Sequence, residues 1–135
     1  MAPTAPDPPP RVLLVMPDQW PRALLRAELR ERGYDALGAP GLAAALAYPV
    51  SVPERGPVRL LLVDQTAVGP DEEPLLARLV ERHGHPAGVL LTRSGQAPAV
   101  GGWRRVLRRP VTIAALADAV TSLLPLPPGA AGPDH

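Results

Sequence analysis

Four side chains with useful chemistry lie at or just beyond the ends of apolar runs. They are Asp18, Asp64, Thr92 and Arg109. A guanidinium can pair with a carboxylate through two parallel hydrogen bonds, and oxygen side chains are the ligands that Mg²⁺ requires. These residue types therefore allow an ion pair between Arg109 and Asp64, and they allow a metal site only where enough carboxylates meet.

The residues around Asp18 argue against a metal. Met16 and Pro17 directly precede it, and a thioether and a proline ring offer no side-chain oxygen to a small, hard cation. Asp18 itself is explained more simply as the N-cap or first-turn charge of a helix. We therefore expect no metal here.

Other catalytic and metal-binding patterns are missing from the sequence. It contains no cysteine, which excludes disulfides, thiolate metal sites and cysteine nucleophiles. His83 and His85 have no third ligand nearby in sequence and are typical of a loop that ends a helix. No glycine-rich phosphate-binding motif and no nucleophile triad is present. The sequence predicts a protein that is not an enzyme and uses no cofactor.

The elements that must position these residues follow from hydrophobic patterning. Five short runs, most of them rich in valine and leucine, predict strands buried on both faces of a parallel sheet, at 11–15, 35–38, 58–64, 88–92 and 105–107. Helical spacing between and after them predicts helices at about 20–32, 42–47, 71–84 and 112–124. Right-handed crossovers in this order give a five-stranded parallel α/β sheet of flavodoxin-like order 2-1-3-4-5, with helices on both faces.

Proline and glycine mark the ends and the linkers. Proline is dense in residues 1–10 and 125–135, so we expect two disordered tails around one domain at 11–124. The segment 49–57 contains three prolines and is interpreted as a stiff surface loop. In 93–103 glycine and proline discourage more than about one turn of helix, so the fourth helix of such a fold is expected to be shortened or missing.

Within the first helix, Leu25 and Leu29 share one face, and Gly33 supplies a left-handed cap. We expect Arg22, Arg26, Arg30 and Arg32 on the exposed face.

With these elements in place, the chain resembles the receiver domain of bacterial response regulators over roughly residues 11–124. In that family two acidic residues after strand one hold Mg²⁺, and strand three ends in the phosphorylated Asp. Strand four ends in Ser or Thr, and strand five in Lys-Pro. Counting back from Gly33 and Tyr34 places the acidic pair on Met16 and Pro17. The remaining matches are Asp64 to the phosphoacceptor, Thr92 to the hydroxyl and Arg109-Pro110 to Lys-Pro.

The resemblance also marks a signalling face that departs from the family. Receivers normally have a full helix between strands four and five and a Tyr or Phe on strand five, where this chain has Val106. The missing helix is expected to uncover apolar side chains over 95–124, with Val100 and Trp103 at the edge. We interpret this face, including Arg105 and Val106, as a surface for docking or dimerisation, because Trp and Arg dominate interface energetics.

Composition limits the remaining classes of function. The 135 residues carry a net charge of +1 and suit one domain, and such a small charge favours neither nucleic acid nor a membrane surface. The N-terminus has no signal-peptide pattern, and no apolar run approaches the roughly 18 residues of a membrane span. A cytoplasmic protein is expected.

These observations predict a degenerate receiver, or pseudo-receiver, that acts in two-component signal transduction through a protein partner or a homodimer. Because the chain ends soon after the last helix, output is expected to go through a partner. One alternative is a single-domain response regulator phosphorylated on Asp64. Another is a small nucleic-acid-binding protein that uses Trp103 and the neighbouring arginines.

Overall fold

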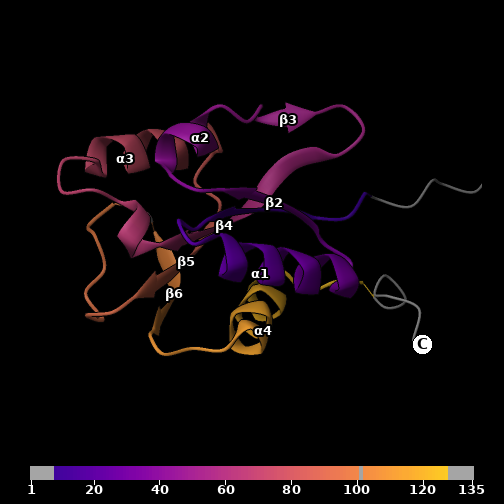
Figure 1. Ribbon diagram of the computed structural model, residues 1–135. Helices are drawn as coiled ribbons and strands as arrows, with labels where there is room; N and C mark the ends of the chain where they lie inside the picture. The colour runs from indigo at the N-terminus through magenta and orange to yellow at the C-terminus, as the bar shows by residue number, and fades with distance from the viewer. Residues whose placement is uncertain (1–7, 101, 128–135) are drawn as a thin grey trace, which may run out of the picture.

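A computed structural model describes residues 8–100 and 102–127 of the chain (Figure 1). Its five main strands are parallel and lie in the order β2-β1-β4-β5-β6. They are β1 (Arg11–Val15), β2 (Asp35–Ala39), β4 (Gly56–Asp64), β5 (Ala87–Thr92) and β6 (Trp103–Arg108). The predicted flavodoxin-like topology is confirmed.

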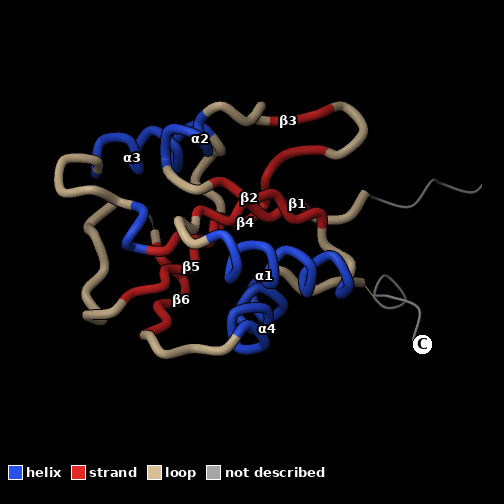
Figure 2. Tube along the Cα trace, in the orientation of Figure 1, coloured by secondary structure: helices blue, strands red, loops and turns tan. Residues whose placement is uncertain are grey.

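Helices cover both faces of this sheet (Figure 2). They are α1 (Gln19–Arg32), α2 (Leu42–Leu46), α3 (Glu73–Arg82) and α4 (Ile113–Leu123), with a short 3-10 turn, η1 (Gln65–Ala67), after β4. Helices α1 and α4 pack on one face, and α2 and α3 pack on the other (Figure 1). None of the helices within residues 8–100 and 102–127 is long and apolar enough to cross a membrane.

The central strands explain the two-sided core. In β1, Val12 and Leu14 point into the cluster under α1 and α4, whereas Leu13 and Val15 point into the cluster under α2 and α3. All four side chains are fully buried. Because successive side chains of a strand point to opposite faces, an uninterrupted apolar run is what a strand between two helical layers requires.

The sheet has one small strand that the sequence did not predict. β3 (Ser51–Val52) pairs antiparallel with Gly56 and Pro57 at the start of β4. The expected stiff loop is therefore a short hairpin, closed by a hydrogen bond of 2.9 Å from the Arg55 amide to the Val52 carbonyl. Gly56 has φ +79°, a left-handed conformation that glycine adopts without strain.

The linker after β5 agrees with expectation, because its described residues, 93–100 and 102, form no helix. Residue 101 lies outside the described part of the chain. Most of the two predicted tails also lies outside it, since only residues 8–10 and 125–127 of them are described, and these have no helix or strand.

The end of α3 buries a histidine. His83 is 8% exposed, and neither ring nitrogen has a hydrogen-bond partner in the described residues. This burial lowers the pKa of His83 below its ordinary 6.5, and the positive charges of Arg82 and Arg11 lower it further. His83 follows the last residue of α3, as the sequence predicted for a helix end.

We expect this histidine to make the fold sensitive to acid. Above pH 6.5 the ring is neutral in both states, but as pH falls below the unfolded pKa the unfolded chain binds a proton that the folded protein resists. Stability should therefore fall from about pH 6.5 downward until the lowered folded pKa is reached. Urea unfolding between about pH 8 and pH 5 measures this slope.

The matched variants are His83→Gln and His85→Gln. The first should flatten the slope between about pH 6.5 and pH 5, and the second, at an exposed position, should leave it unchanged. An unaltered slope in His83→Gln would assign the acid sensitivity to other groups.

Candidate functional site

The candidate site lies at the carboxyl ends of β1, β4 and β5, where the parallel strands present their last residues to one edge of the sheet. Asp64 ends β4 and Thr92 ends β5. Arg109 directly follows β6 and is joined to Pro110 by a cis peptide bond. The structure thus brings three of the predicted side chains to one edge.

The Asp64 carboxylate is buried and fully engaged. Its side chain is 1% exposed. Oδ1 accepts hydrogen bonds from the Thr66 amide at 3.0 Å and the Thr66 hydroxyl at 2.8 Å. Oδ2 accepts a hydrogen bond from Nη2 of Arg109, in an ion pair. The pair that the residue types allowed is therefore present, and both carboxylate oxygens have protein partners.

Thr66 is a site residue beyond those predicted from the sequence, although its spacing from Asp64 is a signal for it. Asp64 and Thr66 stand two residues apart, the spacing at which an Asp side chain accepts a hydrogen bond from the backbone and closes an Asx turn. Here the same bond caps η1. This bond holds the Asp64 carboxylate against the backbone of the next two residues.

Thr92 belongs to a neighbouring polar cluster. Its hydroxyl donates to the side-chain carbonyl of Gln65, the residue after Asp64, and accepts from the Ser94 amide at 3.2 Å. Thr92 is 1% exposed. The hydroxyl is therefore turned toward local partners, and Gln65 is a site residue that the sequence analysis missed.

The end of β1 carries no acidic side chain into the site. Met16 is buried in the cluster under α1 and α4, whereas Pro17 and Asp18 are exposed. Asp18 occupies the N-cap position of α1, as predicted, but its side chain makes no capping hydrogen bond.

Arg22 closes this turn in a way that corrects the sequence analysis. Its Nη1 donates to the carbonyl of Met16 at 2.6 Å and to that of Pro17 at 3.3 Å. The side chain passes over Gly38, where an added Cβ would lie 3.1 Å from it. Arg26, also expected on the exposed face, donates to the Ala36 carbonyl at 3.0 Å. Both arginines are half-buried, and backbone carbonyls of the β1–α1 turn and of β2 accept hydrogen bonds from them. Arg32 is half-buried too, in ion pairs with Glu28 and Asp118, whereas Arg30 is exposed as expected.

The donors at this edge do not fit Mg²⁺. The cation needs about six oxygen ligands in octahedral geometry, but β1 offers a buried thioether and a proline, and Asp64 is already shared by Thr66 and Arg109. Within the described part of the chain, no three His, Cys, Asp or Glu side chains come close enough together to hold a metal ion.

Comparisons with known proteins concern the fold that carries this site. No protein-family model matches the sequence, and none of the curated proteins matches it significantly. Solved structures do match. The receiver domain of non-phosphorylated HemR from Leptospira biflexa has a TM-score of 0.69 at 19% identity, over 87% of this chain and 96% of that one. The response regulator TrrA from Thermotoga maritima, in complex with Mg²⁺-BeF, has a TM-score of 0.65 at 23% identity, over 85% and 99%.

A CheY-like response regulator receiver domain protein from Methanospirillum hungatei JF-1 agrees, with a TM-score of 0.65 at 20% identity over 84% of this chain and 92% of that one. The chain has the receiver-domain fold. At this level of identity the likeness concerns the fold, and the chemistry has to be judged from the side chains that this chain places in it.

On the β6 edge of the receiver fold, the structure corrects one expectation. Trp103 and Val100 are half-buried and pack against the cluster under α2 and α3. The indole thus fills space beside the helix-free linker and is no exposed anchor. Val106 is the exposed apolar side chain of this strand, at 42%. Arg105 is also exposed, and its Nη1 donates to Ser122 of α4 at 3.3 Å.

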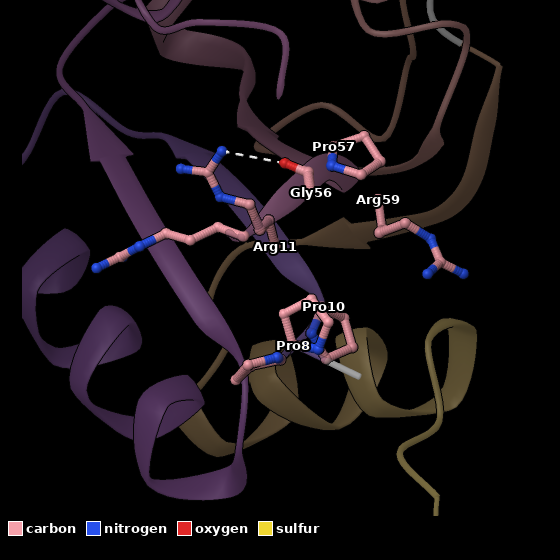
Figure 3. Close-up of a pocket in the computed structure, with 8 residues that line it drawn as sticks. Pro8, Pro10, Arg11, Gly56, Pro57 and Arg59 are labelled. Atoms are coloured by element: carbon pink, nitrogen blue, oxygen red, sulfur yellow. Dashed lines mark hydrogen bonds between the residues drawn. The ribbon is translucent and has the colours of Figure 1, made fainter. Parts of the chain in front are cut away.

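The opposite end of the receiver fold has a hollow of about 270 Å³ lined by prolines and arginines (Figure 3). The Arg11 side chain at this hollow already has partners. Its Nε donates to Asp35 at 3.1 Å, and its Nη1 donates to the Gly56 carbonyl at 3.4 Å. Figure 3 shows the Arg59 side chain pointing away from that of Arg11. The positive charges do not converge, so this hollow is no candidate for an anion site.

Proposed function

We propose that this chain is a degenerate receiver domain, a cytoplasmic pseudo-receiver that acts in signal transduction through protein contacts. It is not an enzyme and has no Mg²⁺-dependent phosphorylation cycle. The observation that carries this proposal is the state of Asp64, whose two oxygens are held by Thr66 and Arg109.

Phosphoryl transfer to Asp64 would require an oxygen free to attack phosphorus and cations that offset the charge on the transferring oxygens. The first requirement conflicts with the three hydrogen bonds on the carboxylate. The second conflicts with Met16 and Pro17, which contribute no carboxylate. Arg109 supplies a positive charge, but its guanidinium is already paired with the Asp64 carboxylate. The arrangement supports a receiver held in one conformation without phosphate.

The surface proposed for the protein partner is the β6 edge with the linker before it. Val106, at 42% exposure, lies between the exposed Arg105 and Arg108 on an edge strand. An exposed apolar side chain beside arginines suits a protein interface. Trp103 is packed against the core, so stacking on a nucleic-acid base, as the nucleic-acid alternative requires, would need this side chain to leave its place.

The decisive experiment treats the protein with Mg²⁺ and acetyl phosphate and measures its intact mass. We expect no gain of a phosphoryl group. Trp20 lies beside the β1–α1 turn, and its fluorescence should show no saturable change at low millimolar Mg²⁺.

Asp64→Asn is the matched control. An adduct on the natural protein that disappears in Asp64→Asn would replace the pseudo-receiver proposal with the single-domain phosphorylated response regulator. An adduct that persists in Asp64→Asn lies at another residue and leaves Asp64 unphosphorylated.

A further inference from the structure

Helix α1 presents an uncovered apolar stripe to solvent. Trp20 is 76% exposed and Leu24 is 54% exposed, the two highest values among the large exposed hydrophobic side chains of the described residues. Ala23 and Ala27 are exposed as well. Positions 20, 23, 24 and 27 fall on one side of an α-helix, so these four side chains form a continuous surface, here called the α1 stripe.

The fold does not need this stripe. Leu25 and Leu29 are the buried residues of α1, and they point to the opposite side, toward the sheet and α4. Contiguous exposed apolar surface often marks an interaction site, and tryptophan is one of the residue types in which interface hot spots are enriched. The α1 stripe is therefore a candidate protein interface.

We propose that the chain self-associates by pairing the α1 stripe, antiparallel, with the same stripe of a second copy. When a two-fold axis passes between positions 23 and 24, the large side chains of one stripe lie opposite the small side chains of the other. Trp20 then lies against the small Ala27 of the second copy, and Leu24 lies against the small Ala23. Two large side chains meet two small ones on each side of the axis.

The charges that flank the stripe complement each other in the same arrangement. Beyond Ala27 the exposed face continues with Arg30 and Glu31, which would reach the amino end of α1 in the second copy. That end has no acidic residue in its first turn, and the Asp18 side chain does not cap it. Glu31 would therefore meet the positive end of a helix dipole, and Arg30 would meet Asp18.

The area of this contact is small, so we expect a low affinity between the two copies. One helix of 14 residues buries less than the roughly 800 Å² per partner of a standard stable interface. We expect a reversible dimer with a dissociation constant of about 10 to 100 µM. β6 lies three strands from β1 in the sheet order, so this dimer leaves the β6 edge open. The inference does not depend on whether Asp64 is phosphorylated.

Sedimentation velocity over about 5 to 500 µM protein tests self-association. The natural protein should pass from monomer to dimer across this range. Leu24→Glu should weaken the dimer at least about tenfold, whereas Val106→Glu, the matched change at the exposed apolar position on β6, should leave it unchanged. A monomer at every concentration, or equal effects of the two variants, would overturn the proposal.

Cysteine cross-linking tests the antiparallel geometry, because the chain contains no cysteine. Ala23→Cys places a thiol next to the two-fold axis and should give a disulfide-linked dimer on mild oxidation. Ala27→Cys should not, because positions 27 of the two copies lie about 10 Å apart along the helices, beyond the roughly 7 Å limit between Cα atoms of a disulfide. Efficient cross-linking of both variants would indicate parallel helices and contradict the proposed pairing.

Discussion

Asp64→Asn is expected to lower the free energy of unfolding by about 2 to 3 kcal/mol. The carboxylate is 1% exposed, and its loss would leave the Arg109 guanidinium, itself 27% exposed, without a countercharge. The Nε of Arg109 is already buried without a hydrogen-bond partner in the described residues. Partial exposure of Arg109 keeps the expected loss below that of a fully buried pair. Urea unfolding at neutral pH measures it.

Two further single variants and one double variant separate the ion pair from the rest of the site. Arg109→Met should also destabilise, and the double variant should lose less than the sum of the two single changes, because each single change removes the same interaction. Arg104→Gln, on the exposed surface of β6, should change stability by no more than about 0.5 kcal/mol. If Asp64→Asn had the same free energy of unfolding as the natural protein, the Asp64–Arg109 pair would make no net contribution to stability.

The location of this pair gives the measurement a functional reading. It joins the end of β4 to the residue after β6, and the linker between β5 and β6 contacts the same region, because Arg108 donates to the Arg93 carbonyl at 3.2 Å. Loss of the pair should therefore raise hydrogen exchange first in β6 and the linker. Such a response would support the proposal that Arg109 holds the domain in one conformation.

The fold was predictable because the apolar runs of β1, β4 and β5 have a single physical explanation. A run such as residues 60–63, buried on both sides, is typical of a strand between two helical layers, and its short length favours a strand over a buried helix. The hairpin at β3 was not predictable in the same way. Its pairing depends on Gly56 adopting φ +79°, whereas the three prolines of 49–57 favoured the prediction of a loop.

The site was predictable in part, for a different reason. Strand ends brought Asp64, Thr92 and Arg109 to one edge because topology alone places them there. The roles of Arg22 and Gln65 depend on which carbonyl or amide each long side chain reaches. That choice is made by packing in three dimensions, so spacing along the sequence could not indicate it.

Asp35→Asn is expected to have the largest effect of all, a loss of about 3 to 4 kcal/mol. Asp35 accepts from Nε of Arg11 at 3.1 Å, and the Arg11 side chain is 4% exposed at the start of the central strand β1. A neutral amide at this position can still accept a hydrogen bond, but it leaves the buried guanidinium of Arg11 without its countercharge, with the Gly56 carbonyl at 3.4 Å as its other described partner. An unpaired buried charge is far more costly than an absent surface pair.

The comparison of the two aspartates makes the result informative. Arg55, 60% exposed, also contacts Asp35 at 3.5 Å, and Arg55→Gln should cost less than about 1 kcal/mol, which would assign the loss to Arg11. Because Asp35 and Arg11 lie at the amino ends of β2 and β1, Asp35→Asn should lower global stability without selectively raising exchange in β6 and the linker. If both variants loosened β6 equally, the Asp64–Arg109 pair would be one more fold-stabilising contact and would not control the proposed docking surface.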